Sequence, residues 1–328
     1  MSRWTFIGSM PLMNWMHDIK SAYELISPYI RKTPVERSAG LEGDDNEVYL
    51  KLDNLQITGS FKVRGALHKL LSLSDEERSR GVIAASSGNH GAAVAYAART
   101  LDSSASVCVP NYASEAKIAA IRGYGADVTL VGDDCVDTEV HARARAAAEG
   151  RAYVSPYNDI DVVRGQGTLG VELAEQIPEL DAVFIAVGGG GLIGGVGAYL
   201  KALNPDIEVV ACSPERSPAL HACLEARSQV EVPCHTTLSD ATAGGVEQGA
   251  VTLPLCFEVV DRSLLVSEED IREGVRYLLG THHTMVEGAA GVAVAAWRQV
   301  AHAYQGKRVA IVLCGANISL DALKEMLS

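Results

Sequence analysis

Short apolar runs alternate with segments of helical spacing along most of the chain. In the first half, the apolar runs cover residues 82–86, 105–110 and 127–132. The helical segments that follow them cover about 91–99, 114–121 and 137–149. In the second half, the runs AVFIAV, EVVACS and RVAIVLCG continue the arrangement. Alternating strands and helices are typical of parallel sheets covered on both faces, so the pattern predicts an α/β protein.

The strand–helix units between residues 81 and 154 follow one another without a break. We therefore interpret residues 81–154 as a small α/β domain inserted into a larger one, which residues 1–80 and 155–328 form. The first 16 residues contain an apolar stretch interrupted by glycine and proline, which makes a poor secretion signal. We expect residues 1–16 to be a disordered extension.

One uncharged stretch has nearly the length of a membrane span. Residues 182–200 carry no charged side chain, but they are rich in glycine, with four in succession at 188–191. Glycine is unfavourable inside a helix because it loses so much backbone freedom. A buried strand, a glycine turn and a helix fit this stretch better than a membrane helix.

Charge and cysteine content narrow the functional classes. The chain has 28 Lys and Arg against 41 Asp and Glu, a net charge of −13, and no basic run. Such a chain is a poor binder of nucleic acid or anionic membranes. Seven cysteines without a CxxC pair suggest reduced thiols and a cytoplasmic location. The spacing of His221, Cys223, Cys234 and His235 matches no standard zinc site, so we expect no metal.

The stretch QITGSFKVRGALHKLL, at 56–71, predicts a helix that begins with a lysine. Its apolar residues fall on one helical face: Val63, Ala66, Leu67, Leu70 and Leu71. Ser60 is the expected N-cap, and Lys62 lies in the first turn away from the apolar face. The positive end of a helix favours the neutral form of an amine, which Schiff-base chemistry requires. The alternative is an ordinary exposed lysine.

A second stretch, ASSGNHG at 85–91, joins a strand to a helix. Backbone N–H groups at such a turn can bind a carboxylate, and the Asn89 side chain can both donate and accept. The alternative is a helix cap without a ligand.

A third stretch, AVGGGGLIGGVG at 186–197, joins a strand to a helix through four glycines. Glycines let backbone amides close around a phosphate at a helix start. The segment from Gly189 to Gly194 also satisfies GxGxxG, and Glu208 follows at a distance tolerable for a dinucleotide-binding acid. A nicotinamide-dependent oxidoreductase is therefore an alternative, although it leaves Lys62 and the SSGNH loop without a role.

A fourth stretch, VLCGANISL at 312–320, ends a predicted strand. Cys314 would lie at the carboxyl end of that strand, where ligands bind in parallel sheets, or it is a buried inert thiol. Glu287 begins a further predicted helix, where its charge suits the helix dipole.

Together, SFKVRGA, SSGNHG, GGGGL and CGAN, in this order, resemble the motifs of the fold-type-II pyridoxal-phosphate enzymes. The resemblance extends over roughly residues 18–327 and is strongest to the serine/threonine dehydratase and serine racemase group. It implies the fold of the tryptophan synthase beta chain, with two open parallel-sheet domains and pyridoxal 5'-phosphate between them. It also suggests a homodimer.

The resemblance assigns a role to each matching position. Lys62 would hold the cofactor as a Schiff base and move the α-proton of the substrate, with Phe61 beside the ring. Asn89 would bind the 3′ oxygen of the cofactor, and Cys314 would lie beside the pyridine nitrogen. The phosphate would be held by Gly188, Gly189, Gly190 and Gly191. The substrate carboxylate would be held by Ser86, Ser87, Gly88, Asn89 and His90.

The implied activity is α,β-elimination from a β-hydroxy amino acid to a 2-oxo acid and ammonia. A neutral thiol beside the ring nitrogen favours rapid loss of a β-leaving group over transamination. Ser87 is at the position of the second base of racemases, so an amino-acid racemase is an alternative within the family. A binding protein without catalysis is the alternative outside the enzymes.

Two departures from the family pattern bear on metals and on the substrate. Metal-activated members carry two carboxylates where this chain has Ser213 and Ala219, so the pattern indicates no divalent-metal site. The stretches ACSPERSPALHACLEA and SDATAGGVEQGA resemble a subgroup of hydroxyectoine-utilisation dehydratases. This implies ectoine degradation and a substrate bulkier than threonine, such as a hydroxylated diaminobutyrate. Arg164 and Glu287 would then help to select the substrate, and the alternative is that both have helix-surface roles.

Overall fold

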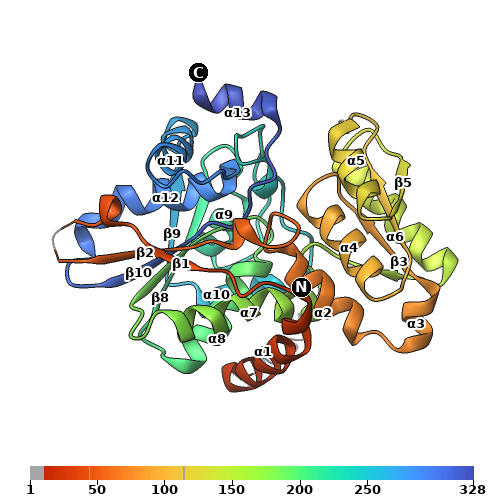
Figure 1. The fold of residues 1–328 in the computed structure, drawn as a ribbon, viewed down its shortest axis with the longest axis horizontal. Helices are drawn as coiled ribbons and strands as arrows, with labels where there is room; N and C mark the ends of the chain where they lie inside the picture. The colour runs from red at the N-terminus through yellow and green to blue at the C-terminus, as the bar shows by residue number, and fades with distance from the viewer. Residues whose placement is uncertain (1–10, 44, 114) are drawn as a thin grey trace.

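A computed structural model describes residues 11–43, 45–113 and 115–328 and contains two sheets in two lobes (Figure 1). The larger sheet has six strands in the order β1, β2, β10, β7, β8, β9. Their bounds are β1 Val35–Arg37, β2 Glu47–Lys51, β10 Arg308–Val312, β7 Ala182–Ala186, β8 Glu208–Pro214 and β9 Arg262–Val266. All neighbours pair in parallel except β1, which is antiparallel to β2.

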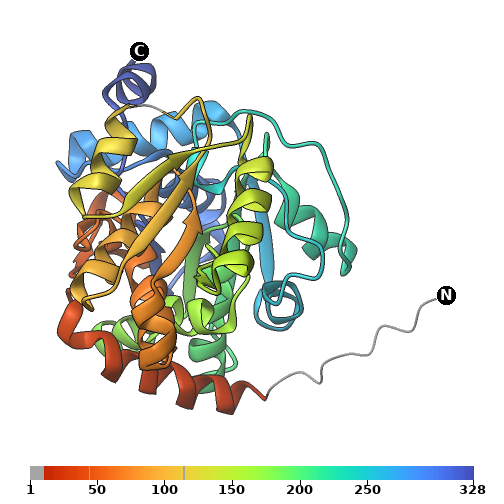
Figure 2. The same cartoon turned by 90° about the vertical axis from the view of Figure 1, so that its right-hand side faces the viewer.

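The smaller sheet has four parallel strands in the order β5, β4, β3, β6. Their bounds are β5 Asp127–Leu130, β4 Ala105–Val109, β3 Val82–Ala85 and β6 Ala152–Tyr153. Figure 2 shows α6 (Cys135–Glu149) on one face of this sheet and α4 (Asn89–Thr100) on the other. All four strands fall within the span 81–154, whose boundaries as a separate domain stay a prediction.

The remaining helices cover the larger sheet or join the two lobes. They are α1 Leu12–Ile26, α2 Lys62–Ser72, α3 Asp75–Arg80, α5 Glu115–Gly123, α7 Ile160–Gln176, α8 Gly191–Leu203, α9 Ala219–Ala226, α10 Thr252–Val259, α11 Glu268–Thr281, α12 Gly288–Val300 and α13 Leu320–Leu327. Five short 3-10 helices complete the described elements: Ser27–Tyr29, Ala39–Leu41, Asp53–Leu55, Asp240–Thr242 and Ala301–Ala303. Residue 114, where we expected α5 to begin, lies outside the described residues.

Burial on both faces explains why the strands of the larger sheet are continuous apolar runs. Every residue of β7 is buried, because α8 packs on one face and α12 on the other. Phe184, in the middle of β7, makes edge-on contacts with the rings of Trp297 and Tyr304, each with centroids 5.4 Å from its own. Such aromatic pairs add stability beyond the apolar area that they bury.

Two expectations about the first 62 residues are wrong. Residues 12–16 are not a disordered extension, because they begin α1, and Trp15 packs into the core; residues 1–10 lie outside the described part of the chain. Ser60 is not the N-cap of α2. The residue before the helix is Phe61, and Ser60 instead pairs with Gly315 in an isolated β-bridge.

The uncharged stretch 182–200 forms β7, the glycine loop and the first ten residues of α8, as the glycine content indicated. Across the residues that the structure describes, no helix combines the length and apolar character needed to cross a membrane.

Candidate active site

A cavity of about 980 Å³ lies where segments of both lobes meet. Its walls include the residues that follow the carboxyl ends of β3, β7 and β10. This is the edge at which open parallel sheets bind ligands, because helix N-termini and loops converge there. All the residues expected to hold the cofactor or the substrate carboxylate line this one cavity: Phe61, Lys62, Ser86, Ser87, Gly88, Asn89, His90, Gly188, Gly189, Gly190, Gly191 and Cys314.

Lys62 is the first residue of α2, and the backbone before it is fixed to β10. The Phe61 N–H donates to the Cys314 carbonyl at 3.0 Å. The Lys62 amine donates to the Pro156 carbonyl at 2.8 Å and lies 5.1 Å from the centre of the Phe61 ring. Burial lowers the pKa of the Lys62 amine to about 8, although Cys314 and Glu287 oppose the shift. The lowered pKa means that the amine loses its proton at a much lower pH than an ordinary lysine, although most of it is still charged at pH 7.

The four glycines form the turn between β7 and α8. Gly190 adopts a left-handed φ of 87°, which favours glycine. A Cβ on Gly189 would collide with the ring of Tyr157, and one on Gly190 would lie 2.8 Å from Sγ of Cys256. The backbone of this turn therefore comes close to its neighbours, and the start of α8 lines the cavity, where helix N–H groups are suited to bind an anion.

The position of Glu208, the expected ribose-binding acid, excludes the dinucleotide-binding alternative. Glu208 is the first residue of β8, whereas a ribose-binding acid follows the end of the equivalent strand. Because β7 and β8 are parallel, Glu208 lies at the edge opposite the glycine loop.

Asn89 is held between two side chains that line the same cavity. Its Nδ2 donates to both carboxylate oxygens of Glu287, at 2.9 and 3.0 Å, and its Oδ1 accepts from Asn317 Nδ2 at 2.6 Å. Asn317 in turn donates to the Thr58 carbonyl at 2.8 Å. The amide orientation of Asn89 is therefore fixed, and its second Nδ2 hydrogen remains available to a ligand.

His90 cannot use its side chain to bind a carboxylate. Its Nε2 lies 2.8 Å from the Val154 carbonyl, so Nε2 carries the hydrogen and Nδ1 is an acceptor. Burial, with a smaller contribution from Lys62, lowers the pKa of His90 to about 3, which keeps the ring neutral. Only backbone N–H groups at the start of α4 can donate to a carboxylate from this position.

Glu287 and Cys314 are buried residues that line the cavity. Burial raises the pKa of Glu287 to about 7, against the hydrogen bond from Asn89. Burial and the neighbouring Glu287 raise the pKa of the Cys314 thiol well above its usual value, so the thiol is neutral. Cys314 is 3% exposed, and its backbone carbonyl accepts from the N–H of Phe61, the residue immediately before Lys62.

Two residues of the cavity, Tyr157 and Asn317, had no predicted role, and Arg164, which we expected to help select the substrate, lies outside it. Tyr157 packs against the glycine loop, and Asn317, the last residue of the CGAN motif, holds Asn89; the sequence had given neither residue a role. Arg164 does not line the cavity. It pairs with Asp18 at 2.6 Å and Asp161 at 3.2 Å, so the expectation that it helps to select a substrate is wrong.

Comparison with known sequences decides the family. Residues 26–315 match the model of the family described as pyridoxal-phosphate dependent enzyme. The chain belongs to this family. It is 38% identical over 315 residues to the L-threonine ammonia-lyase of Thermotoga maritima, across 95% of this chain and 78% of that protein.

Solved structures in the family have the same fold. The processed form of threonine deaminase isoform 2 from Solanum lycopersicum has a TM-score of 0.90 at 30% identity, covering 96% of this chain and 92% of that chain. Maize serine racemase has a TM-score of 0.88 at 28% identity, covering 95% and 96%. The chain is thus a fold-type-II enzyme, as the motifs indicated.

The cavity fits pyridoxal phosphate on the chemistry of its own residues. It contains an amine whose pKa is lowered by burial, and a glycine turn in which a Cβ at Gly189 would fill the space beside Tyr157. A neutral thiol and a fixed amide complete the set of groups that could surround an aromatic ring with polar substituents. In the described residues, no cluster of three or more His, Cys, Asp or Glu side chains is arranged to hold a metal ion.

Proposed function

We propose that the protein is a pyridoxal-phosphate-dependent ammonia-lyase that acts on a β-hydroxy amino acid. The overall reaction removes water across the α and β carbons, and hydrolysis then gives a 2-oxo acid and ammonia. The observation that carries the proposal is the Lys62 amine, which lies in one cavity with the glycine turn and Asn89 and has a pKa lowered to about 8. The relation to threonine ammonia-lyase and threonine deaminase supports this substrate class.

When bound, pyridoxal phosphate withdraws electrons from the α-carbon of the substrate and so makes the α-hydrogen acidic. In our proposal, the N–H groups of the Gly188–Gly191 turn bind the phosphate, and Lys62 holds the cofactor covalently. Once the amino group of the substrate has displaced it from the cofactor, the neutral Lys62 amine would remove the α-proton. Since a general base works best with a pKa near the operating pH, a pKa of about 8 suits this role.

Further residues would orient the substrate and the ring. The backbone N–H groups at the start of α4, together with Ser86 and Ser87, would hold the substrate carboxylate. Asn89 would donate its remaining hydrogen to the 3′ oxygen, with Phe61 against the ring. Cys314, as a neutral thiol, would lie beside the ring nitrogen without protonating it, which favours elimination over transamination.

A finer proposal concerns the size and charge of the substrate. The outer wall of the cavity carries Glu139 and Glu247, which share Arg143 at 2.6 and 2.9 Å. Glu247 also accepts from Asn158 Nδ2 at 2.6 Å, but the two carboxylates outnumber the one guanidinium, and this excess negative charge would attract a second amine. This supports a hydroxylated diaminobutyrate, the substrate implied by the hydroxyectoine-like stretches, over threonine itself.

The first experiment is reductive trapping of the cofactor. We expect the purified protein to be yellow, to lose visible absorbance with borohydride, and to carry the reduced adduct on the peptide that contains Lys62. Threonine, serine and hydroxydiaminobutyrate are then screened for release of a 2-oxo acid. Lys69→Ala, which removes a part-buried lysine of the same helix that pairs with Asp159 outside the cavity, is the matched control for Lys62→Ala and should retain the adduct and the activity.

Two results would overturn the proposal. One is a protein that stays colourless with added pyridoxal phosphate; the other is full lyase activity in Lys62→Ala. Chiral analysis of residual substrate tests the racemase alternative, which rests on Ser87 as a second base in the cavity. We further propose a cytoplasmic homodimer, which size-exclusion chromatography with light scattering would test.

A further inference from the structure

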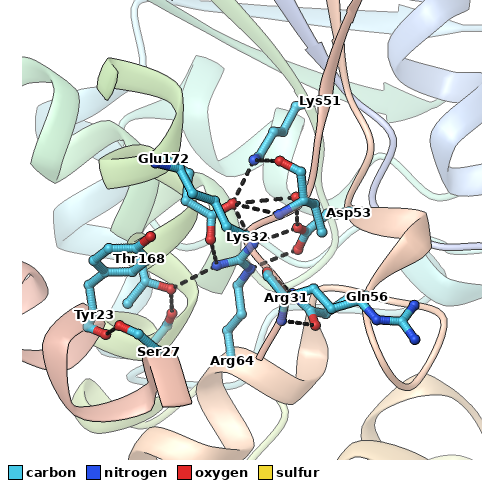
Figure 3. Close-up of polar contacts among 12 residues, drawn as sticks. Tyr23, Ser27, Arg31, Lys32, Lys51, Asp53, Gln56, Arg64, Thr168 and Glu172 are labelled. Carbon is cyan, nitrogen blue, oxygen red and sulfur yellow. Dashed lines mark hydrogen bonds and ion pairs between the residues drawn. The ribbon is translucent and has the colours of Figure 1, made fainter. Parts of the chain in front are cut away.

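A fully buried network of charged side chains lies behind the helix that carries Lys62 (Figure 3). Its four ionic members come from different elements: Lys51 from β2, Asp53 from the 3-10 helix Asp53–Leu55, Arg64 from α2 and Glu172 from α7. All four side chains have no solvent exposure. Two cations and two carboxylates balance each other in charge.

The network leaves no ionic donor without a partner. Arg64 directs Nε and Nη2 to Asp53, at 2.9 and 2.7 Å. It directs Nη1 and Nη2 to Glu172, at 2.7 and 3.0 Å, and Nη1 also reaches Thr168 at 3.3 Å. All five N–H groups of the guanidinium are thus used. Lys51 is bonded in the same way, to Glu172 at 2.6 Å and to the Thr33 carbonyl and Gln176, each at 2.7 Å.

Such a network is a costly way to stabilise a fold. Buried ion pairs lose hydration, and apolar side chains of similar volume are often equally stabilising or better. What a guanidinium with five satisfied bonds does provide is a fixed direction, because its planar fork matches two carboxylates at once. The network is therefore better explained by the geometry that it imposes than by its contribution to stability.

The geometry that it imposes is that of the first turn of α2. Arg64 is two residues after Lys62, so the two side chains leave the helix in nearly opposite directions. No side chain caps the start of this helix, which leaves the first turn without the usual local restraint. Arg64 instead anchors the turn from behind while Lys62 reaches into the cavity.

The same network fixes the partner of the Lys62 amine. Glu172 and Thr168 lie on α7, which begins shortly after Pro156, the residue whose carbonyl accepts from Lys62. The two helices touch at their backbones, since a Cβ on Gly165 would lie 2.6 Å from the Arg64 carbonyl. A side chain at the crossing would separate α2 from α7. The ionic bonds across this contact therefore set the position of the lysine relative to the opposite wall of the cavity.

We propose that Arg64 is a positioning residue for Lys62, and that its bonds to Asp53 and Glu172 aim the lysine amine at the aldehyde carbon of the cofactor. This inference rests on the proposed function. The network acts through geometry and not through charge. The groups that shift the pKa of Lys62, besides burial, are Cys314 and Glu287, and no member of the network is among them.

The test measures how fast Lys62 forms its covalent adduct when pyridoxal phosphate is added to protein stripped of cofactor. Absorbance gives the rate, and borohydride trapping with peptide mapping gives the site. In Arg64→Lys we expect a rate at least tenfold lower, because one ammonium group cannot bridge both carboxylates. The pH midpoint of the rate should stay that of the wild type, since the amine keeps its surroundings.

The matched control is Lys51→Met, which removes a different cation from the same network and leaves every bond of Arg64 in place. It should lose stability to urea as Arg64→Lys does, but keep an adduct rate within twofold of the wild type. If both variants slow the reaction equally, the network has only a structural role and the inference is refuted.

Other outcomes are also decisive. A folded Arg64→Lys that reacts at the wild-type rate refutes the inference and leaves the proposed function intact. A wild-type protein that forms no adduct refutes the proposed function and, with it, the inference. If Arg64→Lys does not fold, Asp53→Asn replaces it, because it keeps the shape of the side chain and removes one charge; a wild-type rate there refutes the inference as well.

Discussion

Replacing Lys62 with methionine should abolish the chemistry and make the cofactor-free protein more stable. Burial lowers the pKa of the amine from 10.5 to about 8, a difference that corresponds to roughly 3 kcal/mol of unfavourable free energy for the charged form. The lost hydrogen bond to the Pro156 carbonyl offsets about 1 kcal/mol of this. We therefore expect Lys62→Met to gain about 2 kcal/mol in the free energy of unfolding at pH 7.

The gain should depend on pH in a defined way. Below pH 8 the amine is charged in both the folded and the unfolded chain, so the variant has its full advantage. Between pH 8 and 10.5 the unfolded wild type holds more protons, and the wild-type stability rises with pH. The difference between the two proteins should thus fade over this window. Urea unfolding of cofactor-free protein at pH 7 and at pH 10 measures both values.

Lys69→Met is the matched control and should change in the opposite direction. Burial disfavours the charged form of Lys69, but the hydrogen bonds and charges of Asp159 and Asp161 outweigh it and raise its pKa. That pairing contributes stability at neutral pH, which is lost only as pH rises through the raised pKa, so its removal should destabilise the protein. If Lys62→Met is less stable than the wild type at pH 7, or if its advantage is the same at pH 10, our account of the buried amine is wrong.

Three further predictions concern the other walls of the site. Glu287→Gln should stabilise the cofactor-free protein by up to about 3 kcal/mol above pH 7 and not at pH 4. The reason is that the wild type loses stability between pH 4.5 and 7, where the carboxyl of Glu287 ionises in the unfolded chain before it does in the folded chain. Urea unfolding across this pH range measures the effect. Gly189→Ala should weaken cofactor binding at least tenfold in a spectral titration, because the new methyl group collides with Tyr157. Treatment with EDTA should leave lyase activity within twofold of its starting value, because Ser213 and Ala219 offer no carboxylate to a divalent metal.

Each of these has a control or a contrary outcome. Gly88→Ala places its methyl group in open space and should keep the cofactor affinity of the wild type. An identical pH dependence in Glu287→Gln and the wild type would mean that this carboxyl is already charged in the folded chain. Activity that EDTA removes and magnesium restores would show that a metal binds through residues other than the pair considered above.

The spacing of apolar residues along the chain predicted most of the fold. The strand runs of the second half became β7, β8 and β10, because a strand buried on both faces must be apolar throughout. The same spacing rule should have identified α1, in which Trp15, Ile19, Ala22 and Ile26 recur on one face. The glycine and proline that interrupt the first 16 residues outweighed that signal, and the expectation of disorder was wrong for residues 12–16.

Pairing between distant segments accounts for what the sequence could not reveal. Ser60 has the composition of a helix cap, but its backbone pairs with Gly315, far along the chain. Asn317 belongs to a recognised motif, yet its bond to Asn89 depends on how the two lobes meet. Charged residues such as Lys51 and Arg64 are ordinarily exposed, and no local sequence pattern predicts that they are buried in ion pairs.

The position of β10 in the larger sheet has a consequence for synthesis in the cell. β10 is the only strand of that sheet, in the described residues, that pairs with both β2 and β7. The ribosome makes it after all the others, so β2 and β7 emerge long before the strand that joins them. Until then both strands present open edges to solvent, which chaperones would have to shield. Cys314 and Asn317 follow directly, so a nascent chain completes its cofactor cavity only when β10 has emerged from the exit tunnel.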